Sequence, residues 1–92
     1  MIQSFSHSET SRLWEEERSK RYGAIARMAL RKLIQLNAAE NLADLRTPPG
    51  NRLEALKGKR AGQHSIRIND QWRICFRWTP AGPAEIEIVD YH

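Results

Sequence analysis

The spacing of apolar residues changes along the chain, from a helical period before residue 50 to a strand period after it. In residues 24–39 apolar side chains recur at intervals of three and four, which predicts a helix with one apolar face. That face carries Ile25, Met28, Ala29, Leu33 and Leu36, and the opposite face carries Arg27, Arg31 and Gln35. Residues 47–51, with the sequence Thr-Pro-Pro-Gly-Asn, are unsuited to a helix interior or a central strand and predict a rigid loop.

A shorter helix is predicted before Gly23. Ser8 or Thr10 can cap its start, acidic residues occupy its early turns, and basic residues lie near its predicted end. The acidic residues are Glu9, Glu15, Glu16 and Glu17, and the basic ones are Arg18, Lys20 and Arg21. This distribution of charge complements the helix dipole. Ahead of the helix, residues 2–5 are suited to a short edge strand.

After residue 64 apolar and polar residues alternate, as they do in strands with one buried face. The apolar members are Ile66, Ile68, Trp72, Ile74, Phe76, Trp78, Ala84, Ile86 and Ile88. Two helices followed by three amphipathic strands predict an α+β fold, in which the two N-terminal helices pack on one face of a mostly antiparallel β-sheet. Because the chain has no internal repeat and no linker, we expect residues 1–92 to form a single domain.

The apolar side chains must share one face of this sheet, and that requirement predicts the strand register. Ile68 faces Trp72 across a three-residue turn, residues 69–71, so Arg67 lies opposite Arg73. Like charges paired across two strands destabilise a sheet. We therefore expect both arginines to bind an anion, and we expect the loss of Arg73 to leave stability unchanged or higher.

The same rule predicts the pairing across residues 79–83. It pairs Trp78 with Ala84, Phe76 with Ile86 and Ile74 with Ile88. Arg77 then meets Glu85, which indicates a structural role for Arg77. The last strand continues past the arginine pair and brings Asp90, Tyr91 and His92 beside the turn at residues 69–71.

Composition limits the class of protein. With 92 residues, of which 40% are apolar, the chain suits one small globular fold. No run approaches the ~18 apolar residues of a transmembrane helix, and the first residues lack the basic and apolar regions of a signal peptide. Its single cysteine, Cys75, cannot form an internal disulfide. These features predict a cytoplasmic protein that folds without covalent cross-links.

Positive charge is concentrated in one part of the chain. The whole chain has a net charge of +4, and residues 52–77 alone carry seven basic and two acidic side chains. Such a local excess suits a polyanionic partner, nucleic acid first and a membrane surface second. A solvated basic face without a partner is the alternative interpretation.

Recognisable metal and cofactor motifs are missing from the sequence. His7, His64, His92 and Cys75 are scattered without the short spacing of a ligand pair, and the chain has no glycine-rich phosphate loop. We therefore expect neither a metal nor a cofactor. Cys75 has no motif that would activate it, which indicates an inert small side chain.

A set of residues suited to metal-free RNA cleavage remains: Lys57, Arg67, Arg73, Asp90, Tyr91 and His92. That reaction needs one group to take the proton of a ribose 2′-hydroxyl, another to protonate the leaving 5′-oxygen, and cations around the phosphate. Histidine suits the proton transfers and arginine suits the phosphate. In the alternative interpretation His92 is a terminal residue without a role and Tyr91 covers the core.

Several segments in order resemble the HigB branch of the RelE/ParE toxin superfamily. They are residues 48–58 (PPGNRLEALKG), 62–69 (GQHSIRIN), 72–76 (WRICF) and 89–92 (VDYH), and the likeness extends to the first five residues. The resemblance implies a microbial-ribonuclease-like fold and a toxin that cuts mRNA in the ribosomal A site without a metal. It also implies neutralisation by a helix–turn–helix antitoxin of the HigA type, through which the pair would bind operator DNA.

The resemblance further implies roles for individual residues. Lys57, Arg67 and Arg73 would stabilise the scissile phosphate, His92 would transfer protons, Asp90 and Tyr91 would orient His92 or the substrate, and Arg52, Lys59 and Arg60 would contact RNA. Some relatives carry a catalytic histidine upstream of the Leu-Lys-Gly element, where this chain has Glu54. That difference places a second catalytic histidine in doubt.

Two other functions fit the same fold. One is the action of ParE-like toxins, which poison DNA gyrase and cleave nothing; the other is a basic module that obstructs ribosomal RNA. The terminal tyrosine and histidine, predicted to lie near Arg67 and Arg73, favour the nuclease because an inhibitor does not require them.

Overall fold

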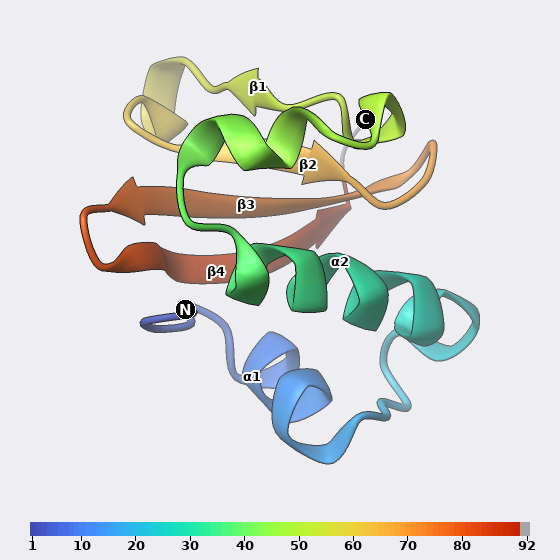
Figure 1. Cartoon of the computed structure of the whole chain (residues 1–92). Helices are drawn as coiled ribbons and strands as arrows, with labels where there is room; N and C mark the ends of the chain where they lie inside the picture. The colour runs from blue at the N-terminus through green and yellow to red at the C-terminus, as the bar shows by residue number, and fades with distance from the viewer. Residues whose placement is uncertain (91–92) are drawn as a thin grey trace.

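A computed structural model describes residues 1–90. In it the chain folds into two α-helices and one four-stranded antiparallel sheet (Figure 1). The helices are α1 (Ser8–Glu16) and α2 (Ala26–Ala38). The strands are β1 (Glu54–Ala55), β2 (His64–Arg67), β3 (Trp72–Thr79) and β4 (Gly82–Asp90), and they neighbour one another in chain order. The predicted α+β class is confirmed.

Short 3₁₀ turns connect these elements. They are η1 (Gly23–Ile25), η2 (Leu42–Arg46), η3 (Pro49–Asn51) and η4 (Gly58–Arg60). The predicted loop at residues 47–51 contains η3 and a cis peptide bond between Thr47 and Pro48. Within the described residues, no helix has the length and apolar character needed to cross a membrane.

Helix α1 differs from its prediction at both ends. It begins after His7, and neither Ser8 nor Thr10 caps it. Thr10 is instead fully buried, and its hydroxyl accepts a hydrogen bond of 3.1 Å from the backbone N–H of Ile88 in β4. The helix ends at Glu16 because Glu17 adopts a left-handed conformation with φ of 59°. The basic residues 18–21 therefore follow the helix. Glu15 and Glu16 lie in its last turn and Glu17 ends it, so their predicted place in the early turns is wrong.

Helix α2 buries most of its predicted apolar face. Ala29, Leu33 and Leu36 are fully buried. Met28, which was predicted on the same face, is 40% exposed, because it lies one residue, about 100° of helix rotation, away from Ala29. Gln35 was predicted on the solvent face but is half-buried, since its side-chain oxygen accepts a hydrogen bond from Asn51.

The register predicted between β2 and β3 is confirmed. Arg67 pairs with Arg73 in the ladder, and the N–H of Ile68 donates to the carbonyl of Trp72 at 2.9 Å. The side chain of Asn69 closes the turn by accepting hydrogen bonds from the backbone N–H groups of residues 71 and 72.

The register between β3 and β4 follows the prediction only at one end. Ile74 pairs with Ile88, as predicted. A bulge then shifts the ladder between Cys75 and Arg77, so that Trp78 pairs with Pro83. The predicted pairing of Trp78 with Ala84 is therefore wrong, and the predicted pair of Phe76 with Ile86 falls at the bulge.

The bulge still allows the predicted contact between Arg77 and Glu85. Glu85 has φ of 52°, the left-handed geometry in which a strand takes up an extra residue. The guanidinium of Arg77 donates to the Glu85 carboxylate at 2.9 Å. The contact is confirmed, although the backbone register around it differs.

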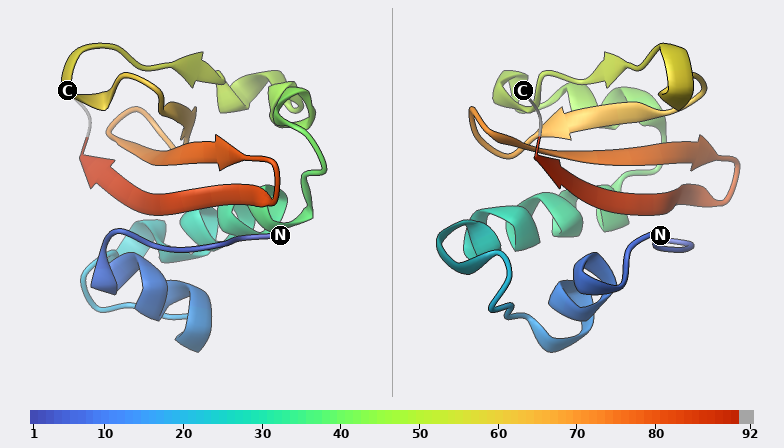
Figure 2. Two further views of the ribbon diagram at one scale, coloured as in Figure 1. Left: turned by 90° about the vertical axis from the view of Figure 1, so that its left-hand side faces the viewer. Right: turned by 180° about the vertical axis from the view of Figure 1, so that it is seen from behind.

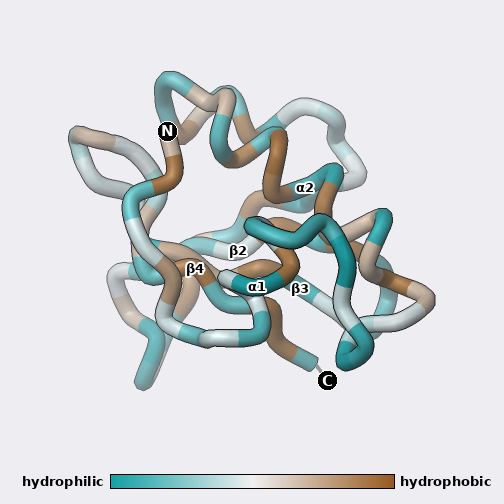
Figure 3. Tube along the Cα trace, turned by 90° about the horizontal axis from the view of Figure 1, so that it is seen from below, coloured by the Kyte–Doolittle hydropathy of each residue, from teal (hydrophilic) through white to brown (hydrophobic). Residues whose placement is uncertain are grey.

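One side of the sheet packs against the helices. The buried core joins α1 and α2 to β2, β3 and β4, and hydrophobic residues alternate with hydrophilic ones along these elements (Figure 3). Seen from behind, the other face of β2, β3 and β4 has no α-helix in front of it (Figure 2). We call this second side the outer face.

The two edges of the sheet differ. Residues 3–6 run beside β4, where Phe5 and Ile86 form a single parallel bridge in place of the predicted strand. At the opposite edge lies β1, which pairs Glu54 with Ser65 and Ala55 with His64. The sequence did not predict β1, because two residues are too few to show alternation.

Candidate functional site

The strand pairing brings polar residues together on the outer face. One row across the four strands consists of Glu54, Ser65, Cys75 and Glu87, which are paired in register. The neighbouring row contains Arg67 and Arg73. Residues paired across adjacent strands point to the same side of a sheet, so the predicted arginine pair and these four residues share one surface.

Arg73 is held rigidly in this surface. Its residue is only 8% exposed, and its Nε donates to the hydroxyl of Ser65 at 2.8 Å. Its Nη2 donates to the carbonyl of Arg52 at 2.8 Å. Arg52 can present that carbonyl because it closes the η3 turn in a left-handed conformation, with φ of 47°. The sequence predicted that loss of Arg73 leaves stability unchanged or higher, whereas these hydrogen bonds lead us to expect that it lowers stability.

Arg67 is more accessible. Its side chain is 29% exposed, and its guanidinium forms an ion pair with Asp70 in the β2–β3 turn. The Asp70 side chain is 99% exposed, so the pair is open to solvent and an anion that binds Arg67 can displace the carboxylate. Because Arg67 and Arg73 occupy facing positions, they present two guanidinium groups on one part of the outer face.

Lys32 is a further cation that lies near Arg67, and the pattern of the sequence did not point to it. Lys32 is half-buried in α2, and its Nζ donates to the side-chain oxygen of Asn51 at 2.6 Å. Burial, together with the positive charge of Arg67, lowers the pKa of Lys32. The only signal in the sequence was its position next to Leu33 at the margin of the apolar face of α2.

The basic residues of η4 line a cleft beside β1. This open cleft has a volume of about 580 Å³ and is lined by Glu54, Ala55, Leu56, Lys57, Lys59 and Arg60. Lys57 and Lys59 are exposed to solvent. Arg60 is partly withdrawn, because its guanidinium donates to the Glu87 carboxylate and to the Gln63 side chain, both at 3.1 Å. Arg60 was predicted to contact RNA together with Arg52 and Lys59, but its guanidinium is already paired within the protein.

Cys75 lies beneath these charged side chains and is fully buried. Burial raises the pKa of the Cys75 thiol, and the carboxylates of Glu87 and Glu54 act in the same direction. The cations of Arg60 and Arg73 oppose this shift without cancelling it. A buried, protonated thiol is a poor nucleophile, which supports the interpretation of Cys75 as an inert side chain.

The chain leaves β4 close to the arginine pair. Asp90 pairs with Trp72, as predicted, and its carboxylate accepts a hydrogen bond of 3.1 Å from the side chain of Gln71. This contact places Asp90 beside the turn at residues 69–71. Tyr91 and His92, the predicted orienting and proton-transfer residues, lie outside the described residues.

No group of three or more His, Cys, Asp or Glu side chains that could hold a metal ion is found in residues 1–90.

Comparison with known proteins identifies the family. A family model described as the RelE-like toxin of the type II toxin–antitoxin system HigB matches residues 3–92. The chain belongs to this family. Among its relatives is Toxin HigB-1 of Vibrio cholerae serotype O1, which is 39% identical over 80 residues, a match that covers 85% of this chain and 84% of the relative.

A second relative matches over a shorter stretch. An uncharacterized protein of Haemophilus influenzae is 46% identical over 48 residues, which are 52% of this chain and 48% of the relative. Membership of the family makes this chain the toxin of a type II toxin–antitoxin system and implies an antitoxin partner.

Proposed function

We propose that this toxin is an endoribonuclease that cleaves mRNA on the ribosome and so inhibits translation. RelE-like HigB toxins are generally endoribonucleases, which supports the class of reaction. The observation that carries the proposal is the pairing of Arg67 with Arg73 on the outer face, beside the strand end that leads to His92. The proposed site of action is the cytoplasm, in the A site of the translating ribosome.

In the proposed reaction the RNA supplies its own nucleophile. A base takes the proton of the ribose 2′-hydroxyl, the 2′-oxygen attacks the adjacent phosphorus, and the 5′-oxygen leaves with a proton from an acid. The products are a 2′,3′-cyclic phosphate and a 5′-hydroxyl. No water or bound metal is required, because both proton transfers use side chains.

The cations have distinct proposed roles. Arg73, fixed by Ser65 and Arg52, would contact the scissile phosphate in a preset orientation, and Arg67 would exchange Asp70 for a phosphate oxygen. Such preorganised donors stabilise the charge that develops on phosphate. Lys57 would add charge from the neighbouring cleft.

The remaining proposed roles concern proton transfer and RNA binding. His92 would transfer protons, with Asp90 and Tyr91 orienting it or the substrate. Arg52, Lys59 and Arg60 would contact RNA outside the cleavage point. Since Arg60 is paired with Glu87, its contact requires that ion pair to open.

The proposed partner is a HigA-type helix–turn–helix antitoxin, which also carries the operator-binding activity of the pair. The family assignment supports an antitoxin in general.

Primer extension on a translated mRNA tests the proposed function. After induction of the toxin without its antitoxin, we expect discrete cuts within codons, and we expect none when His92 alone is deleted. A general acid–base group contributes about 10²–10⁴-fold to a rate, while removal of a terminal residue scarcely affects folding. Growth arrest with intact mRNA would contradict the proposal and favour gyrase poisoning or obstruction of ribosomal RNA.

A further inference from the structure

The edge of the sheet at β1 is open, in contrast to the edge at β4. At β4 the N-terminal segment closes the edge, with hydrogen bonds from Gln3 to Pro83 and between residues 4–6 and Ile86. At β1 the views from the front and from behind show no described segment lying beyond the strand (Figures 1 and 2). Both residues of β1 are exposed. An exposed strand edge is a template for pairing with another chain.

The backbone groups at this edge point outward. The N–H of Leu56 donates to the carbonyl of Gln63 at 2.9 Å, so Leu56 faces β2. In an antiparallel ladder, successive residues direct their backbone groups to opposite sides. The N–H and C=O of Ala55 therefore point away from β2. The alternation also directs the N–H of Lys57 outward, because Lys57 is extended, with φ of −123° and ψ of 177°.

Two clefts lie against β1, and Ala55 lines both of them. One is the basic cleft at η4, where Lys57 and Lys59 are exposed. The second has a volume of about 400 Å³ and is lined by Leu42, Ala43, Arg46, Leu53, Ala55 and His64. Its lining is mainly apolar, and it lies on the side of the sheet to which Ala55 and His64 point as a pair.

One residue that lines the second cleft, His64, has a polar atom that lacks a partner among the described residues. The Nδ1 of His64 is buried and forms no hydrogen bond among the described residues. Buried polar atoms are almost always hydrogen-bonded in folded proteins, and an exception calls for an explanation. Because this atom is already buried, a chain that enters the cleft can bind it only if the His64 ring rotates toward the cleft that it lines.

We propose that β1 is the docking edge for an extended segment of the antitoxin, which adds to the sheet as a fifth strand. A peptide in this position would exchange backbone hydrogen bonds with Ala55. Side chains of a strand alternate between faces, so the residue opposite Ala55 enters the apolar cleft and the neighbour opposite Leu56 points to the side of the basic cleft, near Lys57 and Lys59. The predicted segment therefore has an apolar residue next to an acidic one, and it has no acidic residue opposite the carboxylate of Glu54.

An antitoxin segment docked at β1 would compete with RNA for the basic cleft. An acidic side chain beside Lys57 and Lys59 would occupy the positions proposed for RNA phosphates, so the antitoxin and RNA would exclude each other there. That consequence rests on the proposed function, whereas the docking itself rests on the family assignment and on the geometry of β1.

Hydrogen exchange on the toxin–antitoxin complex tests the docking. The probe is the antitoxin that is encoded with this toxin, copurified with the full toxin chain. We expect the amides of Ala55 and Lys57 to exchange rapidly in the free toxin and to be protected in the complex. A stable complex without protection at residues 54–57 would overturn the proposal, as would protection confined to α2 around its exposed apolar residues, Met28 and Ile34.

Substitutions at one position provide a second, independent test. Ala55→Pro removes the outward N–H, and proline is tolerated in edge strands where that group faces solvent. Ala55→Ser keeps the N–H and serves as the matched control. We expect the dissociation constant of the complex to rise about tenfold or more for Ala55→Pro and to change little for Ala55→Ser. Equal affinity of the two variants would contradict the proposal, and neither measurement depends on nuclease activity.

Discussion

Arg73 is a cation whose surroundings fix its orientation before any substrate arrives. Two acceptors on different segments, the Ser65 hydroxyl and the Arg52 carbonyl, bind two different nitrogens of its guanidinium. The planar group therefore cannot rotate freely, and the entropy cost of orienting it is met during folding. Within residues 1–90, the guanidinium of Arg67 pairs only with the exposed Asp70 and lacks this restraint. The paired arginines thus differ in how firmly their partners hold them, although the sequence made them look equivalent.

Removal of Arg73 is expected to lower both stability and activity. Arg73→Ala leaves the Ser65 hydroxyl and the Arg52 carbonyl without their donor, which costs about 1–3 kcal/mol of unfolding free energy. Denaturant unfolding measures this loss. Arg77→Ala is the control: its ion pair with Glu85 joins side chains that are 43% and 52% exposed, and exposed pairs contribute about 0–1 kcal/mol. Equal losses of unfolding free energy in the two variants would contradict the inference that these hydrogen bonds hold Arg73 in place.

Cys75 is expected to make stability depend on alkaline pH. Because burial raises its pKa from the usual value of 9.0, the folded protein retains the thiol proton at a pH where the unfolded chain releases it. The unfolded state therefore binds fewer protons, and stability falls as the pH rises above 9.0. The difference in unfolding free energy between the wild type and Cys75→Ala should shrink between about pH 7 and about pH 10, because the thiol of the unfolded chain loses its proton over this range. A constant difference would contradict this account.

At the scale of elements, the buried face of α1 is joined to β4 by a hydrogen bond as well as by packing. The hydroxyl of Thr10 accepts from the N–H of Ile88 and also lies 3.3 Å from the Tyr22 hydroxyl. Tyr22 in turn contacts the Trp72 ring edge-on, with centroids 5.9 Å apart. These contacts fix the helix on the sheet at the end where the candidate site lies.

Thr10→Val is expected to weaken this attachment. The variant keeps the shape of the side chain but leaves the buried N–H of Ile88 without an acceptor, at a cost of about 1–3 kcal/mol. Thr10→Ser retains the hydroxyl and should lose much less. Thermal unfolding of the two variants compares them, and similar melting temperatures would show that the hydrogen bond contributes little.

The elements differ in how far the sequence could predict them. The apolar period of α2 and the alternation in β3 were readable because each extends over several residues that face the same core. The end of α1 and the bulge at Glu85 depend on left-handed conformations of glutamate, which no residue preference signals. The two-residue strand β1 is shorter than one period of any pattern.

The candidate site was predictable to a similar extent. The pairing of Arg67 with Arg73 follows from strand register and could be derived from the sequence. The burial of Arg73, the engagement of Arg60 by Glu87 and the approach of Lys32 to Arg67 each depend on a tertiary contact. Such contacts join segments that are distant in sequence, so a local pattern does not reveal them.

The η4 turn, together with Lys57 that directly precedes it, is expected to supply salt-dependent affinity for the ribosome. Replacing both Lys57 and Lys59 by alanine should reduce the slope of log K against log salt by about 0.7–0.9 for each phosphate contact that is lost. Cosedimentation with ribosomes across a salt series measures the slope. Arg60 is left unchanged because its substitution would also break the ion pair with Glu87.

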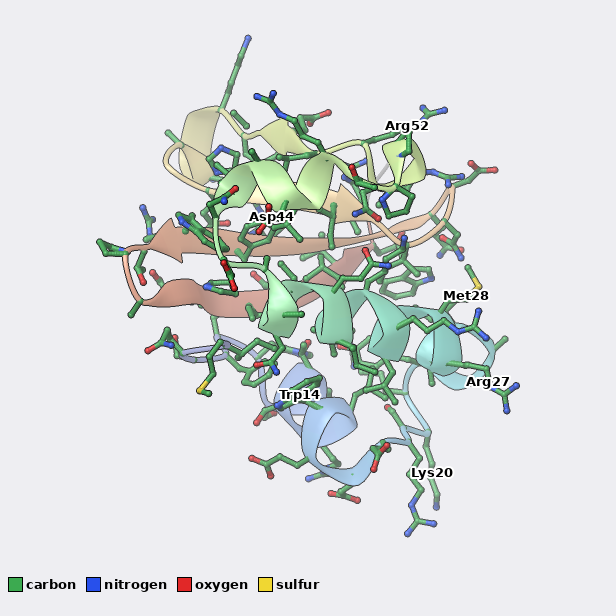
Figure 4. The ribbon with its side chains drawn as sticks, in the orientation of Figure 1. Trp14, Lys20, Arg27, Met28, Asp44 and Arg52 are labelled. Atoms are coloured by element: carbon green, nitrogen blue, oxygen red, sulfur yellow. The ribbon has the colours of Figure 1, made fainter. Side chains whose placement is uncertain are left out.

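Lys20→Ala is the control for this experiment. Lys20 is exposed, and it lies at the end of the molecule away from Arg52 (Figure 4). An identical slope for the double variant and the wild type would show that η4 does not contact RNA.

At the scale of the whole molecule, the two faces of the sheet have different roles. Its inner face supports the helices through a continuous apolar core. Its outer face carries the arginine pair and adjoins the basic cleft. The antitoxin edge proposed at β1 adjoins this outer face, so binding of the partner and of RNA would be coupled through the same few residues. In the proposed mechanism this outer face promotes attack by the 2′-hydroxyl of the RNA itself.

Cleavage of a chemically modified mRNA on purified ribosomes tests this claim most directly. The cut is first mapped on an unmodified message, and a second message is then made with a single 2′-deoxynucleotide on the 5′ side of that bond. We predict that the toxin cuts the unmodified message and leaves the deoxy-substituted bond intact, because the attacking oxygen is missing. Cleavage of both messages at the same rate would contradict the account, since the nucleophile would then have to be something other than the 2′-hydroxyl.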